Sequence, residues 1–216
     1  MPILDPNKNA KNSFRRKRFR LFENIIERII KEKNACRILD IGGEPNYWLS
    51  NAASLDWHKL EVRLLNLSAF ETRQPGLISV VGDARNMKEY DDLSFDVVHS
   101  NSVIEHVGHW SDMVAMANEV RRLAPHYFVQ TPYFWFPIEP HARFPMFQWM
   151  PESWRYRILM KRTCGFWKRS PDVGSAMTAV QSAVLLDRKQ MQFLFSDAKI
   201  VSERIFGFTK SLIAIR

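Results

Sequence analysis

The chain has 216 residues, of which 46% are hydrophobic and 25% are charged, and its formal net charge is +8. This length and balance are ordinary for one soluble domain with a large core, so we treat residues 1–216 as a single domain. Two cysteines, Cys36 and Cys164, stand far apart, which argues against a disulfide framework or a zinc site and favours a reducing compartment.

The first expected element is a helix over residues 14–31. Its apolar residues recur at helical spacing, and basic residues crowd its first part. One interpretation is an amphipathic helix that covers a sheet and leaves its charges in solvent. The other is a surface for phosphates or anionic lipid. No stretch is apolar enough for a membrane span or a signal-peptide core, so we expect a cytoplasmic protein, with contact to the inner face of the membrane left open.

Strands and helices alternate from residue 36 onward, which predicts right-handed crossovers and a parallel sheet. The expected strands are 36–41, 61–67, 77–81, 95–100 and 126–131, and the expected helices are 47–53, 112–123 and 187–195. Ser111 or Asp112 could cap the second helix. Strands at 199–205 and 211–216, joined through residues 206–210, predict an antiparallel hairpin at one sheet edge.

Small polar or acidic residues follow several of the expected strands. Asp40 precedes Gly42 and Gly43, Asn66 ends the second strand, and Asp83 follows the third. The carboxyl ends of parallel strands form the edge of an open α/β sheet where ligands bind. The two glycines let a ligand approach the backbone closely. The sequence therefore predicts a binding site at this edge.

A long segment at residues 133–171 interrupts the alternation after the fifth strand. It holds eleven aromatic and seven basic residues, punctuated by prolines. Aromatic faces bind sugar rings, lipid tails and unpaired bases, although an insert of this size also needs a core of its own. Long inserts at this edge usually serve as lids. We expect Tyr133, Arg143, Arg155 and Arg157 to bind the substrate, with the arginines on a phosphate group.

Five segments together resemble the class I S-adenosylmethionine (SAM)-dependent methyltransferases of the type 11 group. They are 39–43 (Leu-Asp-Ile-Gly-Gly), 82–84 (Gly-Asp-Ala), 94–98 (Ser-Phe-Asp-Val-Val), 104–107 (Ile-Glu-His-Val) and 119–125 (Glu-Val-Arg-Arg-Leu-Ala-Pro). The resemblance covers residues 37–131. It implies an α/β Rossmann-like fold, with a seven-stranded, mostly parallel sheet, an antiparallel terminal hairpin and SAM at the carboxyl edge.

The resemblance also implies positions for the cofactor. Asp40, Gly42 and Gly43 would face its methionine portion. Asn66 would face the ribose, Asp83 and Ala84 the adenine, and Ser100 and Asn101 would line the floor under the sulfonium. The chain departs from the family pattern, because Glu44 and Asn46 replace two of the three usual glycines and Asn66 replaces an acidic residue. These changes weaken the expectation of SAM binding without removing it.

A hydroxyl acceptor must lose its proton during methyl transfer, which calls for a general base or a metal ion. His106 is one candidate base, and His141 with Glu139 to orient it is the other; each histidine could equally be structural. Ubiquinone-type O-methyltransferases carry Glu-x-x-Glu-His in the analogous region and can bind a divalent metal. Ser102 stands in the first position here, so we expect no metal site.

The expected function is therefore SAM-dependent O-methylation. Residues 136–141 (Phe-Pro-Ile-Glu-Pro-His) resemble segments of methyltransferases found beside polysaccharide and glycolipid assembly functions, which favours a carbohydrate or glycolipid acceptor. Two alternatives stay open: methylation of a small natural product or quinone-like aromatic, and an RNA-binding or non-catalytic relative. The RNA alternative lacks a recognisable RNA-binding module in the sequence. Oligomeric state is not predicted.

Overall fold

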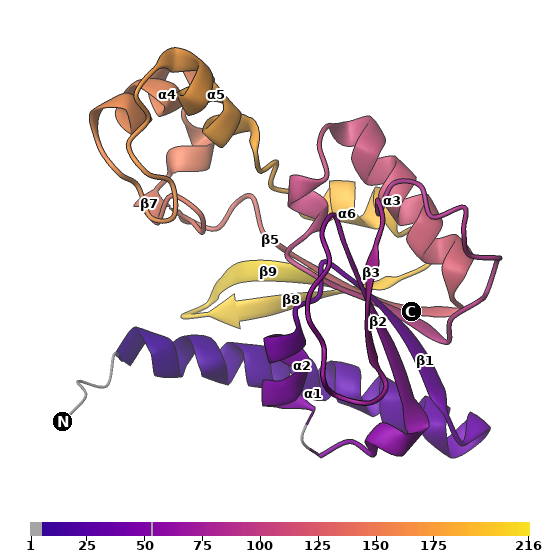
Figure 1. Cartoon of the computed structure of the whole chain (residues 1–216). Coiled ribbons are helices and arrows are strands. Elements are labelled where there is room, and N and C mark those ends of the chain that lie inside the picture. Colours follow the sequence, from indigo (N-terminus) through magenta and orange to yellow (C-terminus); the bar gives the residue numbers. More distant parts are fainter. Residues whose placement is uncertain (1–5, 53) are drawn as a thin grey trace.

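A computed structural model describes residues 6–52 and 54–216, with the backbone alone for residues 6–15. The first two side chains of the expected 14–31 helix therefore lie outside this description. The chain forms a seven-stranded sheet in the order β3-β2-β1-β4-β5-β9-β8, parallel throughout except for β9. Figure 1 shows the sheet between layers of helices. Its strands are β1 (Cys36–Ile41), β2 (Leu60–Asn66), β3 (Leu77–Val81), β4 (Val97–Asn101), β5 (His126–Pro132), β8 (Lys199–Ile205) and β9 (Phe208–Ile215). This topology confirms the predicted fold class.

The register of the central strands brings their carboxyl ends together at one edge. Ile41, the last residue of β1, is paired with Leu65 of β2 and with Ser100 of β4. These strands are buried along most of their length, as expected for parallel strands with helices on both faces. The glycine turn after β1 therefore lies beside Asn101, the last residue of β4.

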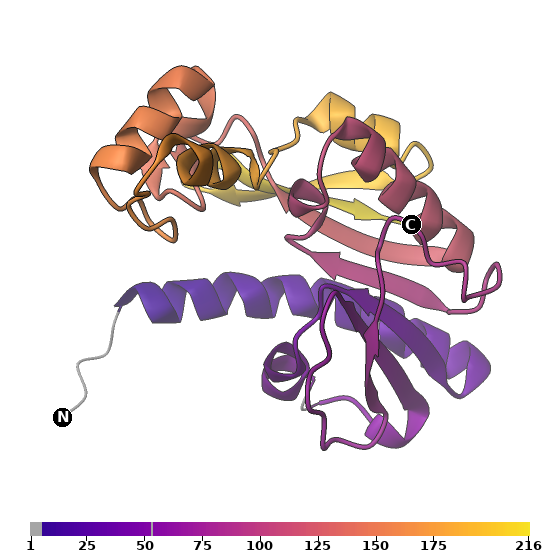
Figure 2. The same cartoon turned by 45° about the horizontal axis from the view of Figure 1, so that its top comes forward.

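Helices cover both faces of the sheet (Figure 2). On one face, α1 (Pro6–Lys33) and α2 (Pro45–Asn51) bury a core around Phe22, Ile26 and Trp48. On the other face, α3 (Trp110–Leu123) and α6 (Arg188–Leu194) bury methionines and leucines. The predicted role of the first helix as a cover for the sheet is therefore confirmed from residue 16 onward.

Several element boundaries differ from the sequence predictions, among them the start of α3 and the turn of the β8–β9 hairpin. Helix α3 begins at Trp110, and Asp112 accepts a hydrogen bond from the backbone N–H of His109 (2.9 Å), so neither Ser111 nor Asp112 is the cap residue. The β8–β9 hairpin has only two turn residues, Phe206 and Gly207, instead of the predicted 206–210 link. Both have positive φ (47° and 83°), which is the geometry of a tight type I′ turn.

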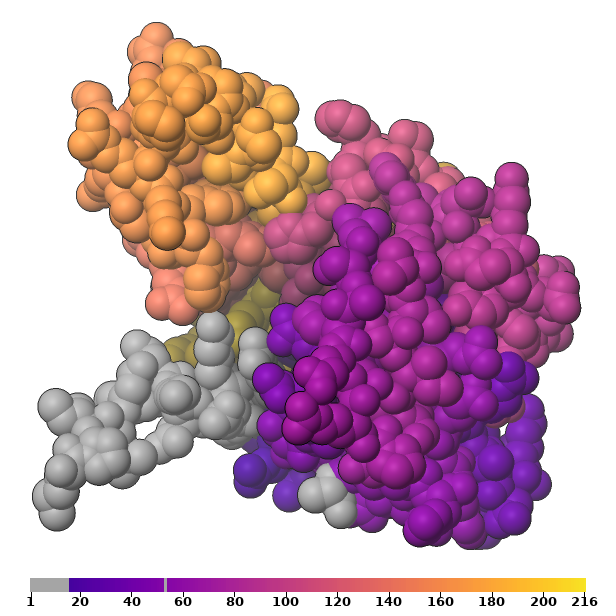
Figure 3. Space-filling view, viewed as in Figure 1, coloured from indigo at the N-terminus to yellow at the C-terminus, as the bar shows by residue number. Residues whose placement is uncertain are grey.

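The insert after β5 forms a separate small lobe, which we call the lid (residues 133–186; Figure 3). It contains β6 (Ile138–Glu139), β7 (Phe144–Pro145), α4 (Glu152–Lys161) and α5 (Val173–Gln181). It has a hydrophobic core of its own with six buried residues, among them Phe147, Leu159 and Cys164. The lid is longer than the predicted 133–171 segment, because α5 consists of small apolar residues without aromatic or basic ones.

The two ends of the lid meet at the sheet. The backbone N–H of Phe134 donates to the carbonyl of Leu186 (3.0 Å), and Tyr133 and Leu186 form an isolated parallel bridge. The lid is therefore closed at its base by hydrogen bonds between residues about fifty positions apart in sequence. Among the described residues, no helix combines the length and apolar character that a membrane span requires.

Candidate active site

Two cavities lie at the carboxyl edge of the sheet and share Gly42 and Val103 in their walls. The larger, about 390 Å³, is lined by residues that follow β2 and β3, including Asn66, Asp83 and Ala84. The smaller, about 220 Å³, is lined by residues that follow β1 and β4: Asp40, Gly42, Gly43, Glu44, Tyr47, His99, Asn101, Ser102 and Val103. All of the predicted cofactor residues except Ser100 line one of these two cavities.

The glycine turn separates the two cavities. Gly42 has a φ of +72°, and its N–H donates to the carbonyl of Leu65 (2.8 Å). A Cβ at Gly42 would overlap Val103, and a Cβ at Gly43 would overlap the carboxylate of Asp40. Both positions therefore require glycine. Without side chains at these positions, a ligand can lie close to the backbone of the turn.

The carboxylate of Asp40 is buried and held by the protein itself. One oxygen accepts from Trp48 Nε1 (2.6 Å), and the other lies 2.6 Å from Nδ1 of the buried His99. The His99 ring in turn lies between Tyr47 and Phe128, with ring centres 5.5 and 5.7 Å away. Asp40 thus fixes the end of β1 and the start of α2, and its direct contact with a ligand stays a prediction.

In the larger cavity, the side chains of Asn66 and Asp83 are also held in place by hydrogen bonds. Asn66 Nδ2 donates to the carbonyl of Gly43 (2.8 Å), so the residue predicted to face the ribose also braces the glycine turn. Arg85 pairs with both oxygens of Asp83, at 2.6 Å from Nη2 and 2.9 Å from Nε. These bonds lower the pKa of Asp83 and keep it ionised.

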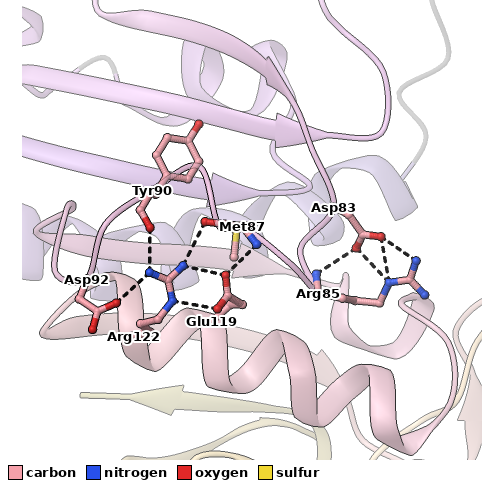
Figure 4. Close-up of polar contacts among 7 residues, drawn as sticks. All are labelled: Asp83, Arg85, Met87, Tyr90, Asp92, Glu119 and Arg122. Carbon is pink, nitrogen blue, oxygen red and sulfur yellow. Dashed lines mark hydrogen bonds and ion pairs between the residues drawn. The ribbon is translucent and has the colours of Figure 1, made fainter.

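The loop that carries Asp83 and Ala84 is fastened to α3 (Figure 4). Glu119 accepts from the N–H of Met87 (2.7 Å) and pairs with Arg122 (2.8 Å). Arg122 also donates to the carbonyls of Met87 and Tyr90, at 3.0 and 2.8 Å. The 119–125 segment singled out in the sequence therefore positions this loop.

Ser100 is a correction to the sequence prediction. Its side chain is completely buried, and its hydroxyl has no hydrogen-bond partner among the described residues. Successive side chains of a strand point to opposite faces of the sheet. Ser100 therefore points away from the face shared by His99 and Asn101. Only Asn101 of the predicted pair lines the smaller cavity.

A third cavity, about 530 Å³, lies between the sheet and the lid. It shares Asn101 and Ser102 with the smaller cofactor cavity, so the two adjoin. Its walls combine cationic, aromatic and polar groups from five parts of the chain: Arg18, Asn101, Ser102, Gln130, Pro132, Tyr133, Phe136, Ile138, Glu139, Pro140, His141, Arg143, Phe166, Lys210 and Ser211.

The candidate bases contact each other, with His141 and Glu139 in the wall of this third cavity and His106 in the wall of the larger cofactor cavity. His106 Nδ1 lies 2.7 Å from the carbonyl oxygen of Ser182, and His106 Nε2 lies 3.1 Å from His141 Nε2. His141 Nδ1 lies 2.7 Å from the buried carboxylate of Glu139, which also accepts from the N–H of Ala142. Burial by itself would lower the pKa of His141, but the hydrogen bond and charge of Glu139 outweigh it and raise that pKa.

Glu105 completes this cluster and was not assigned a role from the sequence. It is buried, and Thr131 Oγ1 donates to one of its oxygens (2.9 Å). The other oxygen has no partner among the described residues. Burial raises the pKa of Glu105. The expectation of no metal rested on Ser102, but the fold brings a further histidine from the lid to Glu105 and His106.

Comparison with known proteins identifies the cofactor half. Residues 40–125 match the family model described as a methyltransferase domain. These residues belong to a class I SAM-dependent methyltransferase domain. No curated protein sequence matches this methyltransferase.

Solved structures share the fold of the methyltransferase at low sequence identity. The magnesium protoporphyrin IX methyltransferase ChlM of Synechocystis PCC 6803, with bound SAH, has a TM-score of 0.53 and 10% identity, covering 100% of this chain and 90% of that one. The N-terminal domain of EvdMO1, solved in the presence of SAH and D-fucose, has a TM-score of 0.52 and 14% sequence identity. The match covers 93% of this chain and 81% of that one. The CurJ carbon methyltransferase has a TM-score of 0.52 and 12% sequence identity, and the match covers 84% of this chain and 48% of that one.

The residues present fit SAM. Two adjoining cavities meet at a glycine turn with no room for a side chain, as an extended cofactor lying against the backbone requires. Asn66, Asp83 and Ala84 would hold the adenosine half. Gly42, Gly43 and Asn101 would hold the methionine half, while Asp40 braces them.

Arg18 lines the third cavity, and it was assigned no place in the site from the sequence. Only 7% of the residue is exposed. Its guanidinium donates to Asn101 Oδ1 (2.5 Å), Gln130 Oε1 (2.8 Å) and Glu203 Oε2 (2.8 Å). The signal was available, because Arg18 lies four residues before the buried Phe22 and so on the apolar face of α1.

The three arginines predicted to bind substrate in the methyltransferase have different surroundings. Arg143 lines the third cavity, and its guanidinium lies 4.4 Å from the centre of the Phe166 ring. Arg155 is partly buried on α4 and pairs with Glu152 (3.6 Å), whereas Arg157 is exposed beside Tyr156. Residues two apart on a helix point to different sides. Neither Arg155 nor Arg157 is among the described residues that line this cavity, so their contact with a substrate stays a prediction.

Proposed function

We propose that this methyltransferase transfers the methyl group of SAM to a hydroxyl of a carbohydrate or glycolipid acceptor that carries an anionic group. The observation that supports the proposal most directly is the third cavity, where cationic and aromatic side chains lie next to two histidines and to the cofactor cavity. Such a combination suits a sugar ring with a phosphate or carboxylate attached.

When bound, SAM supplies an electrophilic methyl group, which an acceptor oxygen takes by in-line displacement with S-adenosylhomocysteine as the other product. The protein contributes alignment. Asn101 and Ser102 belong to both cavities, so an acceptor in the third cavity reaches toward the methionine end of the cofactor cavity. The lid, whose two ends are joined at the sheet, holds His141 and Arg143 in the wall of the acceptor cavity.

The histidine pair lies where the acceptor hydroxyl would lose its proton. In the simplest form of the proposal, Nε2 of His141 or His106 accepts that proton. Glu139 orients His141 through Nδ1 and stabilises its protonated form, since the carboxylate is buried and 2.7 Å away. Glu139 therefore acts as a positioning residue.

The charges around the cavity favour an anionic acceptor. Arg18, Arg143 and Lys210 line it from three separate elements, against the single carboxylate of Glu139. Tyr133 and Phe166 supply aromatic faces for an apolar or sugar ring. An acceptor phosphate would pair with the guanidinium of Arg143, which is exposed, while Arg18 is already bonded to three side chains.

Peripheral membrane contact is part of the proposal for a glycolipid acceptor. The tip of the β8–β9 hairpin carries Phe206, 94% exposed, and Phe208, 60% exposed, between Arg204 and Lys210. Exposed aromatics flanked by cations suit an anionic lipid surface.

The test is methyl transfer in a matched panel. Purified protein with SAM is offered phosphorylated sugars, nucleotide sugars and polyprenyl-diphosphate-linked sugars, each beside its dephosphorylated counterpart, and products are measured by mass spectrometry. Methylation of the anionic member at a hydroxyl supports the proposal. Transfer to catechol or quinone-like compounds alone would favour a small aromatic acceptor. SAM binding without transfer, together with salt-sensitive RNA binding, would favour the RNA alternative.

A further inference from the structure

Glu105, His106 and His141 form a cluster whose role goes beyond proton transfer. Glu105 and His106 belong to the short 3₁₀ helix after β4, and His141 comes from the lid. One ligand atom from each lies within 4.8 Å of the other two. The cluster joins two regions of the chain that are 35 residues apart.

The hydrogen bonds of the two rings determine which nitrogens carry protons. His106 Nδ1 faces the carbonyl oxygen of Ser182, and His141 Nδ1 faces the carboxylate of Glu139. Both partners are acceptors, so both Nδ1 atoms carry a proton. In neutral imidazoles the two Nε2 atoms then both carry lone pairs, and these face each other at 3.1 Å. A proton or a metal ion between the rings would replace this repulsion by attraction.

The carboxylate of Glu105 points to the same conclusion. Glu105 is only 1% exposed, and one of its oxygens has no partner among the described residues. A buried polar group without a partner costs free energy, and a buried charge costs more, unless it is paired or coordinates a metal. A cation beside the two Nε2 atoms would supply this partner.

We propose that Glu105, His106 and His141 bind a divalent transition-metal ion such as Zn²⁺. Two imidazoles and one carboxylate are a donor set that suits such ions, whereas Mg²⁺ and Ca²⁺ prefer oxygen ligands. Ligand nitrogens on one such ion lie about 3.0 to 3.4 Å apart, and the observed separation of the Nε2 atoms is 3.1 Å. The Glu105 carboxylate, with an oxygen within 4.8 Å of the ligand nitrogens of both histidines, would move closer to complete the set.

The hydrogen-bond partners that would orient these three ligands are already in place. Metal-bound histidines generally donate their other ring N–H to a carbonyl or a carboxylate. Ser182 provides the carbonyl for His106 and Glu139 the carboxylate for His141, and Thr131 donates to Glu105. His106 is exposed, so a coordination position can remain open to a further ligand.

The position of the ion suggests its role, which rests on the proposed function. His106 lines the adenosine cavity and His141 lines the acceptor cavity. An ion between them could bind the acceptor oxygen and lower the pKa of its hydroxyl, so that the proton leaves to solvent. The histidines would then act as ligands in place of the direct base described above.

The test measures metal binding without SAM or acceptor, so that it is independent of methyl transfer. Metal-stripped protein is titrated with Zn²⁺ by calorimetry, alongside Glu105→Gln, His141→Ala and the control His58→Ala, whose histidine is exposed on another surface. We expect one equivalent at micromolar or tighter Kd for the wild type and His58→Ala. We expect binding at least about 100-fold weaker in His141→Ala and about 10- to 100-fold weaker in Glu105→Gln.

Co²⁺ gives a second readout. The wild type should show visible d–d absorption bands typical of nitrogen and oxygen ligands, and His141→Ala should lose them while keeping the wild-type circular dichroism. Equal Zn²⁺ binding in all four proteins, or none in the folded wild type, would overturn the proposal and leave a proton shared by the two rings. Failure of the acceptor panel with intact metal binding would count against the proposed function only.

Discussion

The cofactor side and the lid side of the site are built in different ways. On the cofactor side, the predicted polar residues are held by their neighbours: Asp40 by Trp48 and His99, and Asn66 by the glycine turn. On the lid side, side chains reach the cavity from irregular backbone, including Arg143 with a φ of 49°. A pre-organised frame suits a cofactor of fixed shape, whereas the acceptor surface depends on the insert.

The largest effect is expected from Asp40→Ala. It leaves His99 and Trp48 buried without their partner, which costs about 3–5 kcal/mol of unfolding free energy, and it should abolish SAM binding. Urea denaturation and calorimetry measure both. Asp40→Asn, which keeps an acceptor oxygen, should lose less stability. If Asp40→Ala kept the stability and the SAM affinity of the wild type, the cofactor side would not be the pre-organised frame described above.

His141→Ala tests the lid side alone. The turnover number should fall by about 10²- to 10⁴-fold, because the variant loses a base or a metal ligand. SAM affinity should stay at the wild-type value, since His141 lines the acceptor cavity and not the cofactor cavities. Steady-state kinetics and calorimetry separate these quantities. An equal loss of SAM affinity would mean that the two sides are not separable.

Gly42→Ala tests the cofactor side with little disturbance of the core. The added methyl would overlap Val103 between the two cofactor cavities, at a residue with positive φ. We expect the Kd for SAM to rise about 10- to 100-fold. The matched control is Gly174→Ala in α5, where a Cβ meets only Asp172 at 3.1 Å and should leave the affinity unchanged.

Arg143→Gln compares two arginines within the lid. The KM for an anionic acceptor should rise about tenfold, with the turnover number less affected, because the charge lines the acceptor cavity. Arg157→Gln, on the exposed side of α4, should match the wild type. Equal effects of the two substitutions would indicate a diffuse positive field and not a defined subsite.

The smallest effect is expected at Asp197, which tests neither side. It accepts from Tyr127 (2.6 Å) and pairs with Arg121 and Arg216. Burial opposes ionisation, but these partners outweigh it and lower the pKa of Asp197. Asp197→Asn should cost about 1 kcal/mol above pH of about 5. The difference from the wild type should shrink as pH falls below about 4, while SAM affinity at pH 7 stays unchanged.

The sheet was largely predictable, and the lid was not. The bounds of β1, β3 and β8 match the predicted ranges, because buried apolar runs between polar turns carry a local signal. The glycine turn and Asn66 were placed at the right edge for the same reason. The place of Arg18 on the apolar face of α1 could be predicted, but its partners Gln130 and Glu203 could not, because they lie far along the chain.

The contact between the lid and the end of β4 had no local sequence signal either. His106 and His141 were named separately, but their contact depends on how the insert folds back over β4. The role of Glu105 depends on a missing partner, which sequence alone does not reveal. Ser100 was misplaced because the resemblance supplied a position without the direction in which the strand points that side chain.

The closed base of the lid has a consequence for how such proteins diversify. Tyr133 and Leu186 are joined at the sheet. The segment between them can therefore be exchanged without changing the distance between the two points where it enters and leaves the sheet. A foreign insert with the same end-to-end spacing could be grafted onto this sheet and inherit its cofactor. Recombination at these two positions would then create new acceptor preferences in one step.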